Sequence, residues 1–510
     1  MQFARNSSLV AVLAAGISLS ALSVASADIL NATTGRSYEA LAEALSAAEN
    51  GQTIEISGGP FAGNFTISKT ITLRGLGDSR PVLDGEGHGT VLTIDAPGVV
   101  VENVAVARSG VDNDLFLNWG GAGVAVKADT TTLRNIDASR NGWGILVFGG
   151  AGLTVEKSTV EDNAREGIKI MGGRDHRIAG NAINRNSAGV LLDVLHEGQR
   201  SAIQTLGDPN SVVQIAREKE TAPRSENIVI SGNEVRGNAG FGIALTWHSN
   251  RNLVENNDVY LTGIERKPDP GQIESLENAV TAGLGGQSVA IVNREGIGAG
   301  IYIFCLSEEN RVIANRSHEN EGSGIVLQLA NRNEVSANAV TKNRIGILLD
   351  SSNANMVGRN TLSENADYGI RIGGDNPLAT GSADNLVTVN DMTANGVNAY
   401  DTSGRTVTAE DLAGVIDTLP YPDMVKQQLR KDPVARKQML QAMLAQLKPT
   451  ANRWDDGVHG NRHDDFDEAT EGFRDDNADG ISEAAHAIPG GTSVDRFPLD
   501  EATVGGQIAQ

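Results

Sequence analysis

Two stretches near the C-terminus combine histidine, aspartate and asparagine at spacings that suit metal ions. The first, "HGNRHDDFD", places His459 and His463 four residues apart, with Asp464, Asp465 and Asp467 beside them. Imidazole nitrogens and carboxylate oxygens together bind copper or zinc, so His459 and His463 are candidate metal ligands. The alternative is a solvated cluster of acidic and basic side chains, and both interpretations stay open at this point.

The second stretch, "DDNADGIS", alternates acidic or amide residues before a glycine, as the first half of a calcium loop does. Its candidate calcium ligands are Asp475, Asn477, Asp479 and Glu483. The twelfth position of the loop is His486, where a complete EF-hand needs glutamate. The sequence therefore excludes an EF-hand and leaves a partial calcium loop or a plain aspartate-rich turn.

A third set of polar residues lies at one phase of a repeat. Segments such as "GIYI" recur along the chain, and in a strand the first and third residues after the glycine face the core while the second and fourth face outward. Most outward positions are apolar, which marks a covered or binding surface. The charged and phenolic members of this face are the candidate ligand-binding residues Lys169, Asp193, Tyr302, Asp350 and Arg371.

Three of these residues have the chemistry that a polyuronate lyase or epimerase needs. Lys169, Tyr302 and Arg371 could serve as base, acid and enolate-stabilising cation. However, stacked coils are about 4.8 Å apart, so Lys169 and Tyr302, about three coils apart, are separated by about 14 Å and cannot serve one carbon atom. The sequence also lacks the Asp-Pro-His motif of known epimerases. Catalysis is therefore the alternative hypothesis, and ligand binding the favoured one.

The repeat itself has a period near 22 residues. The "GIxL"-like segments begin at Gly123, Gly144, Gly167, Gly189, Gly242, Gly300, Gly324, Gly346 and Gly369. Asparagine pairs five residues apart keep the same step, at Asn181/Asn186, Asn233/Asn238, Asn315/Asn320, Asn338/Asn343, Asn360/Asn365 and Asn390/Asn395. This period predicts a parallel β-solenoid, with asparagine at left-handed corners and its amide bonded to the equivalent residue one coil away, and with glycine where the chain turns.

The two wide gaps in the repeat predict insertions near residues 194–225 and 263–297. Both are expected close to the outward face, which they would either cover or flank as the walls of a groove. The β-helix is assigned to residues 59–405, and an amphipathic helix with a first strand at 28–58 is predicted to cap its open end. Residues 406–450 predict short helices broken by prolines, and 451–510 form an aspartate-rich C-terminal cap.

Residues 1–27 predict a cleaved secretory signal peptide, because a short apolar run ends in Ala25-Ser26-Ala27. No later segment is long and apolar enough to span a membrane. The formal net charge of −22 opposes nucleic-acid binding and is compatible with cations or basic partners. Cys305 is the single cysteine, so no internal disulfide forms. We therefore expect a periplasmic or secreted protein.

The repeat and the tail together resemble right-handed parallel β-helix proteins of the pectin-lyase-like fold. They are most similar to the periplasmic copper-binding NosD family, with its carbohydrate-binding and sugar-hydrolase (CASH) repeats, also known as PbH1 repeats. The tail positions that carry the resemblance are Trp454, Asp455, Gly457, Asn461, Asp465, Asp479, Gly480, Ile481, Pro498 and Leu499. Where the family usually has aromatic residues after this asparagine, the chain has Arg462 and His463.

The resemblance implies copper as a cofactor and an envelope protein or a transporter as a partner. Together with the residue patterns, it predicts an all-β fold, a right-handed parallel β-helix with an N-terminal helical cap and a small C-terminal cap. The favoured function is a non-catalytic accessory or binding protein for a periplasmic partner, a metal or a glycan. The alternatives are a polysaccharide lyase or C5-epimerase acting on the outward face, and a purely structural envelope protein.

Overall fold

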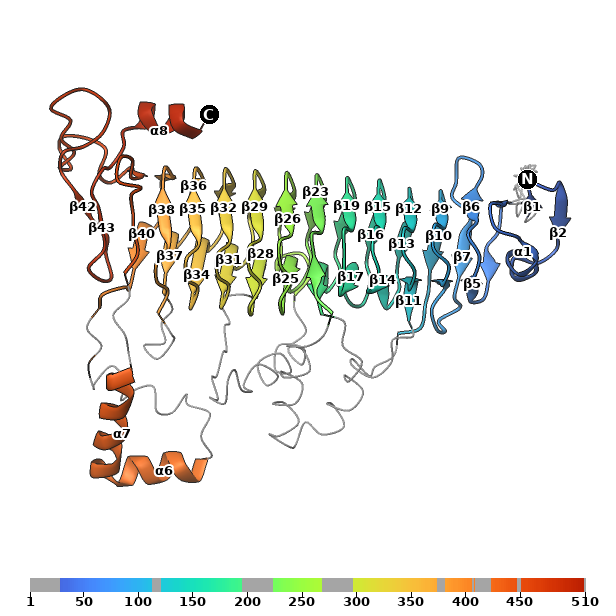
Figure 1. Cartoon of the computed structure of the whole chain (residues 1–510), viewed down its shortest axis with the longest axis horizontal. Coiled ribbons are helices and arrows are strands. Elements are labelled where there is room, and N and C mark those ends of the chain that lie inside the picture. The colour runs from blue at the N-terminus through green and yellow to red at the C-terminus, as the bar shows by residue number, and fades with distance from the viewer. Residues whose placement is uncertain are drawn as a thin grey trace, which may run out of the picture.

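The computed structural model describes residues 28–111, 121–194, 223–267, 297–373, 381–405, 408, 423–446 and 451–508. Within them the chain winds into coils that stack along the length of an elongated molecule (Figure 1). Each coil adds one strand to each of three long sheets, and neighbouring coils pair in parallel. This is the predicted parallel β-helix. The predicted signal peptide, residues 1–27, lies outside the described residues.

The first sheet has 14 strands and begins with an antiparallel pair, β2 and β1. Its order is β2 (Arg36–Tyr38), β1 (Asp28–Asn31), β3 (Thr53–Ser57), β6 (Thr72–Gly75), β9 (Val100–Glu102), β12 (Thr132–Arg134), β15 (Thr154–Glu156), β19 (Arg177–Ala179), β23 (Val229–Ser231), β26 (Leu253–Glu255), β29 (Arg311–Ile313), β32 (Glu334–Ser336), β35 (Met356–Gly358) and β38 (Leu386–Thr388).

The second sheet has 13 strands. Its order is β4 (Phe61–Ala62), β7 (Val82–Asp84), β10 (Ala105–Ala107), β13 (Asp137–Ser139), β16 (Thr159–Glu161), β20 (Ala182–Asn184), β24 (Glu234–Arg236), β27 (Asp258–Tyr260), β30 (Arg316–His318), β33 (Ala339–Thr341), β36 (Thr361–Ser363), β39 (Asp391–Thr393) and β41 (Arg462–His463). Because β41 pairs with β39, strand stacking extends beyond residue 405, the predicted end of the β-helix.

The third sheet has 12 strands and carries the glycine segments of the repeat. Its order is β5 (Phe65–Ile67), β8 (Leu92–Ile94), β11 (Ala122–Val126), β14 (Trp143–Phe148), β17 (Ile168–Met171), β21 (Ala188–Asp193), β25 (Phe241–Leu245), β28 (Ala299–Phe304), β31 (Ser323–Gln328), β34 (Ile345–Asp350), β37 (Tyr368–Ile372) and β40 (Val397–Asp401). Two short pairs complete the strands: β18 (Gly173–Arg174) with β22 (Ser225–Glu226), and β42 (His486–Ala487) with β43 (Val494–Asp495).

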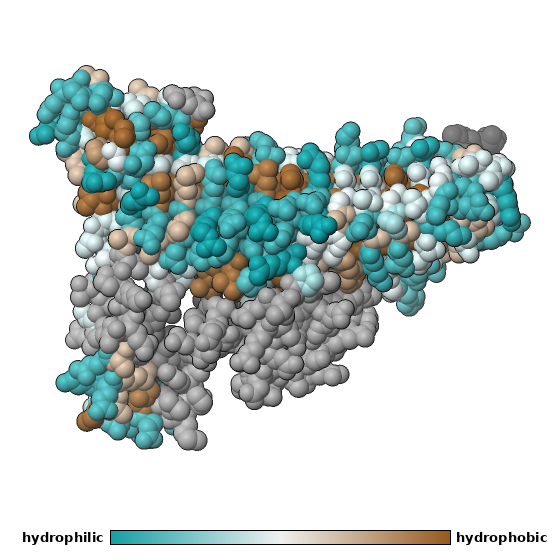
Figure 2. All heavy atoms as spheres, viewed as in Figure 1, coloured by the Kyte–Doolittle hydropathy of each residue, from teal (hydrophilic) through white to brown (hydrophobic). Residues whose placement is uncertain are grey.

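The core fills the space between the three sheets. Alternate residues of each strand point inward, as Ile145 and Val147 do in β14, and one continuous cluster of buried hydrophobic side chains runs from Ile29 to Ile488. Most of its members are isoleucine, leucine or valine, which suit short strands buried on one face. The visible outer surface of the coils is largely hydrophilic or neutral, with smaller apolar patches (Figure 2).

The coil corners carry three asparagine ladders. In each ladder the Oδ1 atom of an asparagine accepts the backbone N–H of the equivalent residue one coil earlier, at 2.8–3.1 Å. The predicted pairs form two ladders. A third ladder precedes the first sheet and contains Asn252, Asn310, Asn333, Asn355, Asn385 and Asn452. Each of its first five members lies five residues before an asparagine of the ladder that contains Asn338. The sequence therefore already contained the spacing that predicts the third ladder.

The backbone conformation at these corners differs from the prediction. The left-handed residue is the one before the ladder asparagine, such as Ala337 with φ 55° or Lys342 with φ 57°. The asparagine itself is needed for its amide, which bonds to the next coil. The repeat glycines are likewise not in the left-handed region. A Cβ on Gly346 would lie 2.4 Å from the Gly369 carbonyl oxygen, so lack of space between coils, not a turn, requires glycine there.

Both long gaps in the repeat leave the stacking of coils intact. β21 pairs directly with β25 across the first gap, and β25 with β28 across the second. The first insertion follows β21 of the third sheet, whereas the second insertion precedes β28 of the same sheet. Residues 195–222 and 268–296, which hold most of both insertions, lie outside the described residues.

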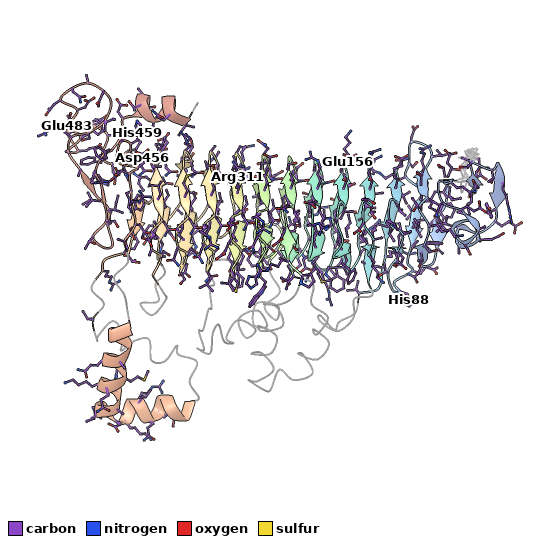
Figure 3. All side chains as sticks on the ribbon, in the orientation of Figure 1. His88, Glu156, Arg311, Asp456, His459 and Glu483 are labelled. Carbon is purple, nitrogen blue, oxygen red and sulfur yellow. The ribbon has the colours of Figure 1, made fainter. Side chains whose placement is uncertain are left out.

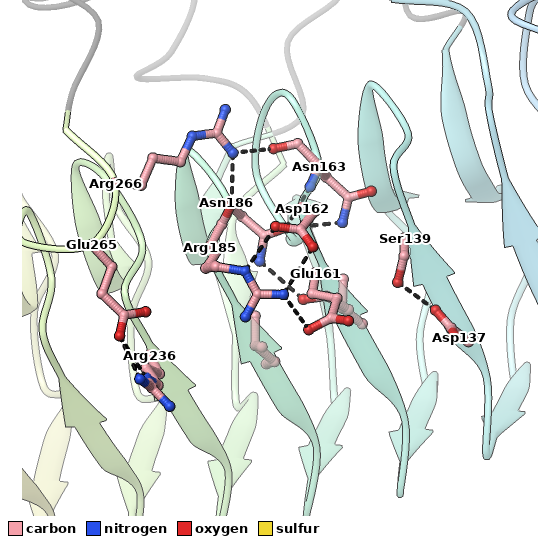
Figure 4. Close-up of polar contacts among 12 residues, drawn as sticks. Asp137, Ser139, Glu161, Asp162, Asn163, Arg185, Asn186, Arg236, Glu265 and Arg266 are labelled. Carbon is pink, nitrogen blue, oxygen red and sulfur yellow. Dashed lines mark hydrogen bonds and ion pairs between the residues drawn. The ribbon is translucent and has the colours of Figure 1, made fainter.

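Arg266 fixes the start of the second insertion against the coils. Its guanidinium donates to the carbonyl oxygens of Asn163 at 2.6 Å, Arg185 at 2.7 Å and Ala164 at 3.2 Å (Figure 4). Burial lowers the pKa of Arg266. Nearby ion pairs, such as Arg185 with Asp162, follow the same corner from coil to coil. The exit of the insertion is therefore attached to two earlier coils.

The helices in the described ranges lie towards the two ends of the chain. At the N-terminus α1 (Leu41–Ala47) packs on β5, so the predicted capping helix is present but shorter than its apolar pattern, and β1 and β2 share the capping role. Near the C-terminus α6 (Asp423–Lys431) contacts α7 (Pro433–Gln446), and Figure 1 shows this pair away from the stacked strands. The chain ends in α8 (Glu501–Ile508). None of the helices in the described ranges has the length and apolar character that crossing a membrane requires.

His176 occupies an asparagine-ladder position and makes stability depend on pH. Its Nδ1 accepts the Leu153 N–H at 3.1 Å, as ladder oxygens do elsewhere, and burial lowers its pKa from 6.5 to about 4. As pH falls below 6.5 the unfolded chain takes up this proton first, so stability is lost between pH 6.5 and 4. In the wild type this titration is expected to lower the free energy of unfolding by about 3 kcal/mol between pH 7 and 4, and His176→Asn is expected to abolish that decrease.

Urea unfolding followed by circular dichroism at several pH values measures this difference. The control is His88→Asn, because His88 is exposed on a loop (Figure 3) and should leave the wild-type pH profile unchanged. Equal pH profiles for the wild type and His176→Asn would contradict the assignment.

Candidate functional site

The outward face of the third sheet carries all five predicted ligand-binding residues. In-register pairing arranges its side chains in rows that cross the strands. One row contains Leu146, Lys169, Leu191, Ala244, Tyr302, Val326, Leu348, Arg371 and Tyr400. The next row places Asp193 beside Met171 and Asp350 beside Gln328. Each polar residue thus has a fixed place on one continuous surface.

Most of this face is apolar and buried. Two clusters lie outside the main core, one around Trp143, Leu146 and Met171 and the other around Tyr302 and Phe304. Tyr302 is 7% exposed and Leu348 is fully buried. Aromatic rings stack on this face. Between ring centroids, Tyr302 lies 4.9 Å from Phe241 on the neighbouring strand and 5.3 Å from Phe304 on its own strand. The face is therefore packed as a second, external core.

Tyr302 and Asp350 are joined through Gln328. The Tyr302 hydroxyl donates to Gln328 Oε1, and Gln328 Nε2 donates to Asp350 Oδ2 at 3.1 Å. Burial raises the pKa of Tyr302 well above its ordinary value of 10. Proton loss from this phenol is therefore unfavourable. Gln328, which reasoning from the sequence left out of the site, is the residue that connects the two predicted ones.

Lys169 and Arg371 lie in separate polar groups on either side of the Tyr302 cluster. Lys169 Nζ is 3.7 Å from Glu166 Oε1, and the other Glu166 oxygen accepts the Trp143 indole N–H at 2.8 Å. Arg371 lies 5.3 Å from the ring centroid of Tyr368 and donates through Nε to a backbone carbonyl at 3.2 Å. The strands of Lys169 and Arg371 are each three steps from that of Tyr302, which corresponds to about 14 Å.

The remaining predicted residue of this face, Asp193, is held locally. Its Oδ1 accepts the Val194 N–H at 2.8 Å, and only 7% of the residue is exposed. The structure therefore places the five residues on one face, as predicted, and among the described contacts Tyr302 and Asp350 share one network.

In the C-terminal cap, His463 meets His486 rather than its sequence neighbour. The rings of His463 and His486 lie 4.5 Å apart between centroids. His463, Asp465 and His486 each offer a donor atom within 4.8 Å of the others, the one such group of three in the described parts of the chain. His459 instead lies 3.7 Å from Asp456, and Figure 3 shows both of these residues in the cap.

The predicted calcium ligands accept hydrogen bonds from backbone N–H groups of their own turn. Asp475 Oδ2 accepts the Gly480 N–H at 2.9 Å, which holds the pKa of Asp475 below its usual value. The side-chain oxygens of Asn477 and Asp479 likewise accept backbone N–H groups, at 3.0 Å each. Glu483 Oε2 accepts the Asp476 N–H at 2.9 Å. These oxygens serve as turn acceptors in the described structure.

The tail residues that carry the family resemblance hold the cap on the last coil. Trp454 is fully buried in the main core and donates its indole N–H to Asp401 at 2.9 Å. Asn461 ends one asparagine ladder, where its backbone N–H donates to Asp495 at 2.7 Å, and its carbonyl accepts the Leu499 N–H at 2.9 Å. These contacts explain the residue types as structural.

Comparison with known families gives two matches along the chain. Residues 87–259 match the family described as "Right handed beta helix region". Residues 289–410 match the family described as "Periplasmic copper-binding protein (NosD)". The second match covers the coils from β28 to β40, which include Tyr302, Asp350 and Arg371.

A curated relative from Pseudomonas aeruginosa is described as "Probable ABC transporter binding protein NosD". It is 25% identical over 146 residues, which cover 26% of this chain and 32% of the relative. The match therefore spans about a third of the relative's length.

Solved structures of similar fold include the A-module of the Azotobacter vinelandii mannuronan C-5 epimerase AlgE6. It has 14% identity and a TM-score of 0.47, covering 71% of this chain and 90% of that one. The Dettilon tailspike protein has 14% identity and a TM-score of 0.45, covering 68% and 61%. At these identities the likeness concerns the fold alone. The stacked coils form a parallel β-helix, as the first family match describes, and over residues 289–410 the chain is similar to the periplasmic copper-binding NosD family.

Proposed function

We propose that this chain is a periplasmic accessory protein that binds a partner in the cell envelope and does not itself transform a sugar. The description of the matching family supports the periplasmic location and names copper as a ligand of its members. The description of the Pseudomonas aeruginosa relative supports an ABC transporter as the partner. The predicted signal peptide at residues 1–27 agrees with export.

One observation carries the non-catalytic part of the proposal, namely the separation of the candidate acid–base residues. A lyase or epimerase needs its base, acid and cation around one carbon atom. Lys169 and Arg371 are each about 14 Å from Tyr302 along one row of the sheet. Tyr302 is also buried, with a pKa well above 10, so its proton is poorly available for transfer. Most of this face is buried, so few of its side chains are open to a charged sugar.

Proton NMR of the purified chain with alginate and polygalacturonate tests the catalytic alternative. We expect unchanged anomeric and unsaturated-sugar signals for the wild type, because Lys169, Tyr302 and Arg371 are too far apart to act on one carbon atom. New signals that disappear in Lys169→Ala or Arg371→Ala would overturn the proposal and make this face an active site.

Chemical crosslinking in the native envelope tests the partner. We expect mass spectrometry of the tagged full-length chain to show crosslinks to a subunit of an ABC transporter. The matched control is the same tagged chain without residues 1–27, which should not reach the envelope and should lose these crosslinks. Equal recovery of transporter subunits with both chains would contradict the proposal.

A further inference from the structure

The C-terminal cap contains a group of metal-ligand side chains with a built environment. His463 belongs to β41, the last strand of the second sheet, and Asp465 lies two residues after it. His486 belongs to the β42–β43 hairpin. Donor atoms of the three residues lie within 4.8 Å of one another. The segments that carry them are 20 or more residues apart in sequence, so only the packing of the cap brings them together.

His463 has a free ligand atom inside the protein. Its side chain is fully buried, and its Nε2 lies 3.3 Å from Asp495 Oδ2. Its Nδ1 is buried and has no hydrogen-bond partner. A buried polar nitrogen without a partner costs free energy unless something binds it. A carboxylate behind the other ring nitrogen is the arrangement that orients histidine ligands of metals, because it fixes the tautomer that leaves the free lone pair.

The other two residues are also arranged as ligands. Asp465 Oδ1 accepts a hydrogen bond from Asn398 Nδ2 at 2.8 Å, which fixes the carboxylate and leaves its second oxygen for a cation. Asp465 is exposed and His486 half-buried, so an ion can reach the group from solvent. Asp495, behind His463, is itself held by the Asn461 N–H at 2.7 Å.

We propose that His463, Asp465 and His486 bind a divalent transition-metal ion of the class of Zn²⁺ or Cu²⁺. Two imidazoles and one carboxylate suit these ions, whereas Ca²⁺ and Mg²⁺ prefer oxygen ligands and Cu⁺ prefers sulfur. The bound ion joins the β42–β43 hairpin to the last coil, and thus stabilises the cap. The site does not depend on the proposed function, because its residues and contacts stand by themselves.

Metal binding to the full chain tests this site directly. After treatment with a chelator, the chain is titrated separately with Zn²⁺ and Cu²⁺ by calorimetry, and bound metal is counted after gel filtration. We expect one ion per chain and a higher melting temperature with metal. His486→Ala is expected to weaken binding by about 100-fold or more and to lose the metal-dependent rise in melting temperature.

His459→Ala is the matched control, since His459 lies in the same cap and is four residues from His463 in sequence. It should bind metal as the wild type does. Equal loss in His459→Ala and His486→Ala would overturn the assigned ligands, and no saturable binding of either ion to the wild type would overturn the site. Melting of His486→Ala without metal, at the wild-type temperature, shows that the variant is folded. If the His486→Ala variant is unfolded, Asp465→Asn, at an exposed position, is tested in its place and must weaken metal binding.

Discussion

Asn338→Ala is expected to lower the free energy of unfolding by about 4 kcal/mol. Asn338 is 1% exposed, and its Oδ1 accepts the buried N–H of Asn315 at 2.9 Å, while its Nδ2 donates to the Val312 carbonyl at 2.9 Å. Alanine leaves both of these backbone groups without their amide partner in a place that water does not reach. Each orphaned buried group costs about 1–3 kcal/mol.

Thermal melting and urea unfolding followed by circular dichroism measure this loss. The control is Lys342→Ala on the same coil, because Lys342 is exposed and its Nζ is 4.0 Å from Glu364, a contact worth less than about 1 kcal/mol. If the two variants unfold at the same urea concentration, the ladder does not stabilise the coils as argued.

Gly324→Ala is expected to cost about 3 kcal/mol by overpacking. A Cβ on Gly324 would lie 2.3 Å from Val340 Cγ1, 2.8 Å from Asn343 Nδ2 and 2.9 Å from the Gly346 carbonyl oxygen. The valine can change its rotamer, but the carbonyl belongs to the next strand and the amide belongs to a ladder. The coils must therefore separate or the ladder must break.

The matched control is Gly505→Ala in α8, where an added Cβ meets nothing within 4 Å. There alanine is expected to leave stability unchanged or raise it by up to about 1 kcal/mol, because alanine favours the helix. Melting temperatures of the two variants separate the effects. A Gly324→Ala protein as stable as the wild type would show that the space between coils is not limiting.

The coils could be predicted because each one repeats the same local requirements. Asn338, Asn360 and Gly346 each recur near the 22-residue period, and one amide per corner and one missing Cβ per coil suffice to specify the stacking. The third ladder, with Asn333 and Asn355, could have been found in the same way, because the spacing of five continues ahead of the predicted pairs.

The reason for each residue type was harder to predict than its position. A left-handed corner and a crowded strand both favour particular residues, and the sequence alone does not say which cause applies. The corner conformation falls on Ala337 and Lys342, one residue before the asparagines, and the repeat glycines lie in extended strands. These assignments depend on backbone angles and on distances between coils.

For the candidate sites, too, residue positions could be predicted from the sequence, whereas side-chain contacts needed the structure. Alternation along strands placed Lys169, Tyr302 and Arg371 on one face, and the fixed distance between coils placed Lys169 and Tyr302 about 14 Å apart. The pairing of strands agrees. The link from Tyr302 through Gln328 to Asp350 needed side-chain positions as well.

The sequence by itself determined the solenoid, its repeat positions and the face that carries the polar residues, because in a repeat each coil contacts mainly its neighbours. Only the tertiary structure decided that His463 faces His486 and Asp495 rather than His459. The cap has no repeat, so long-range packing alone sets which of its side chains meet. The energy of that packing depends on the whole arrangement of the cap, and spacing along the chain does not encode it.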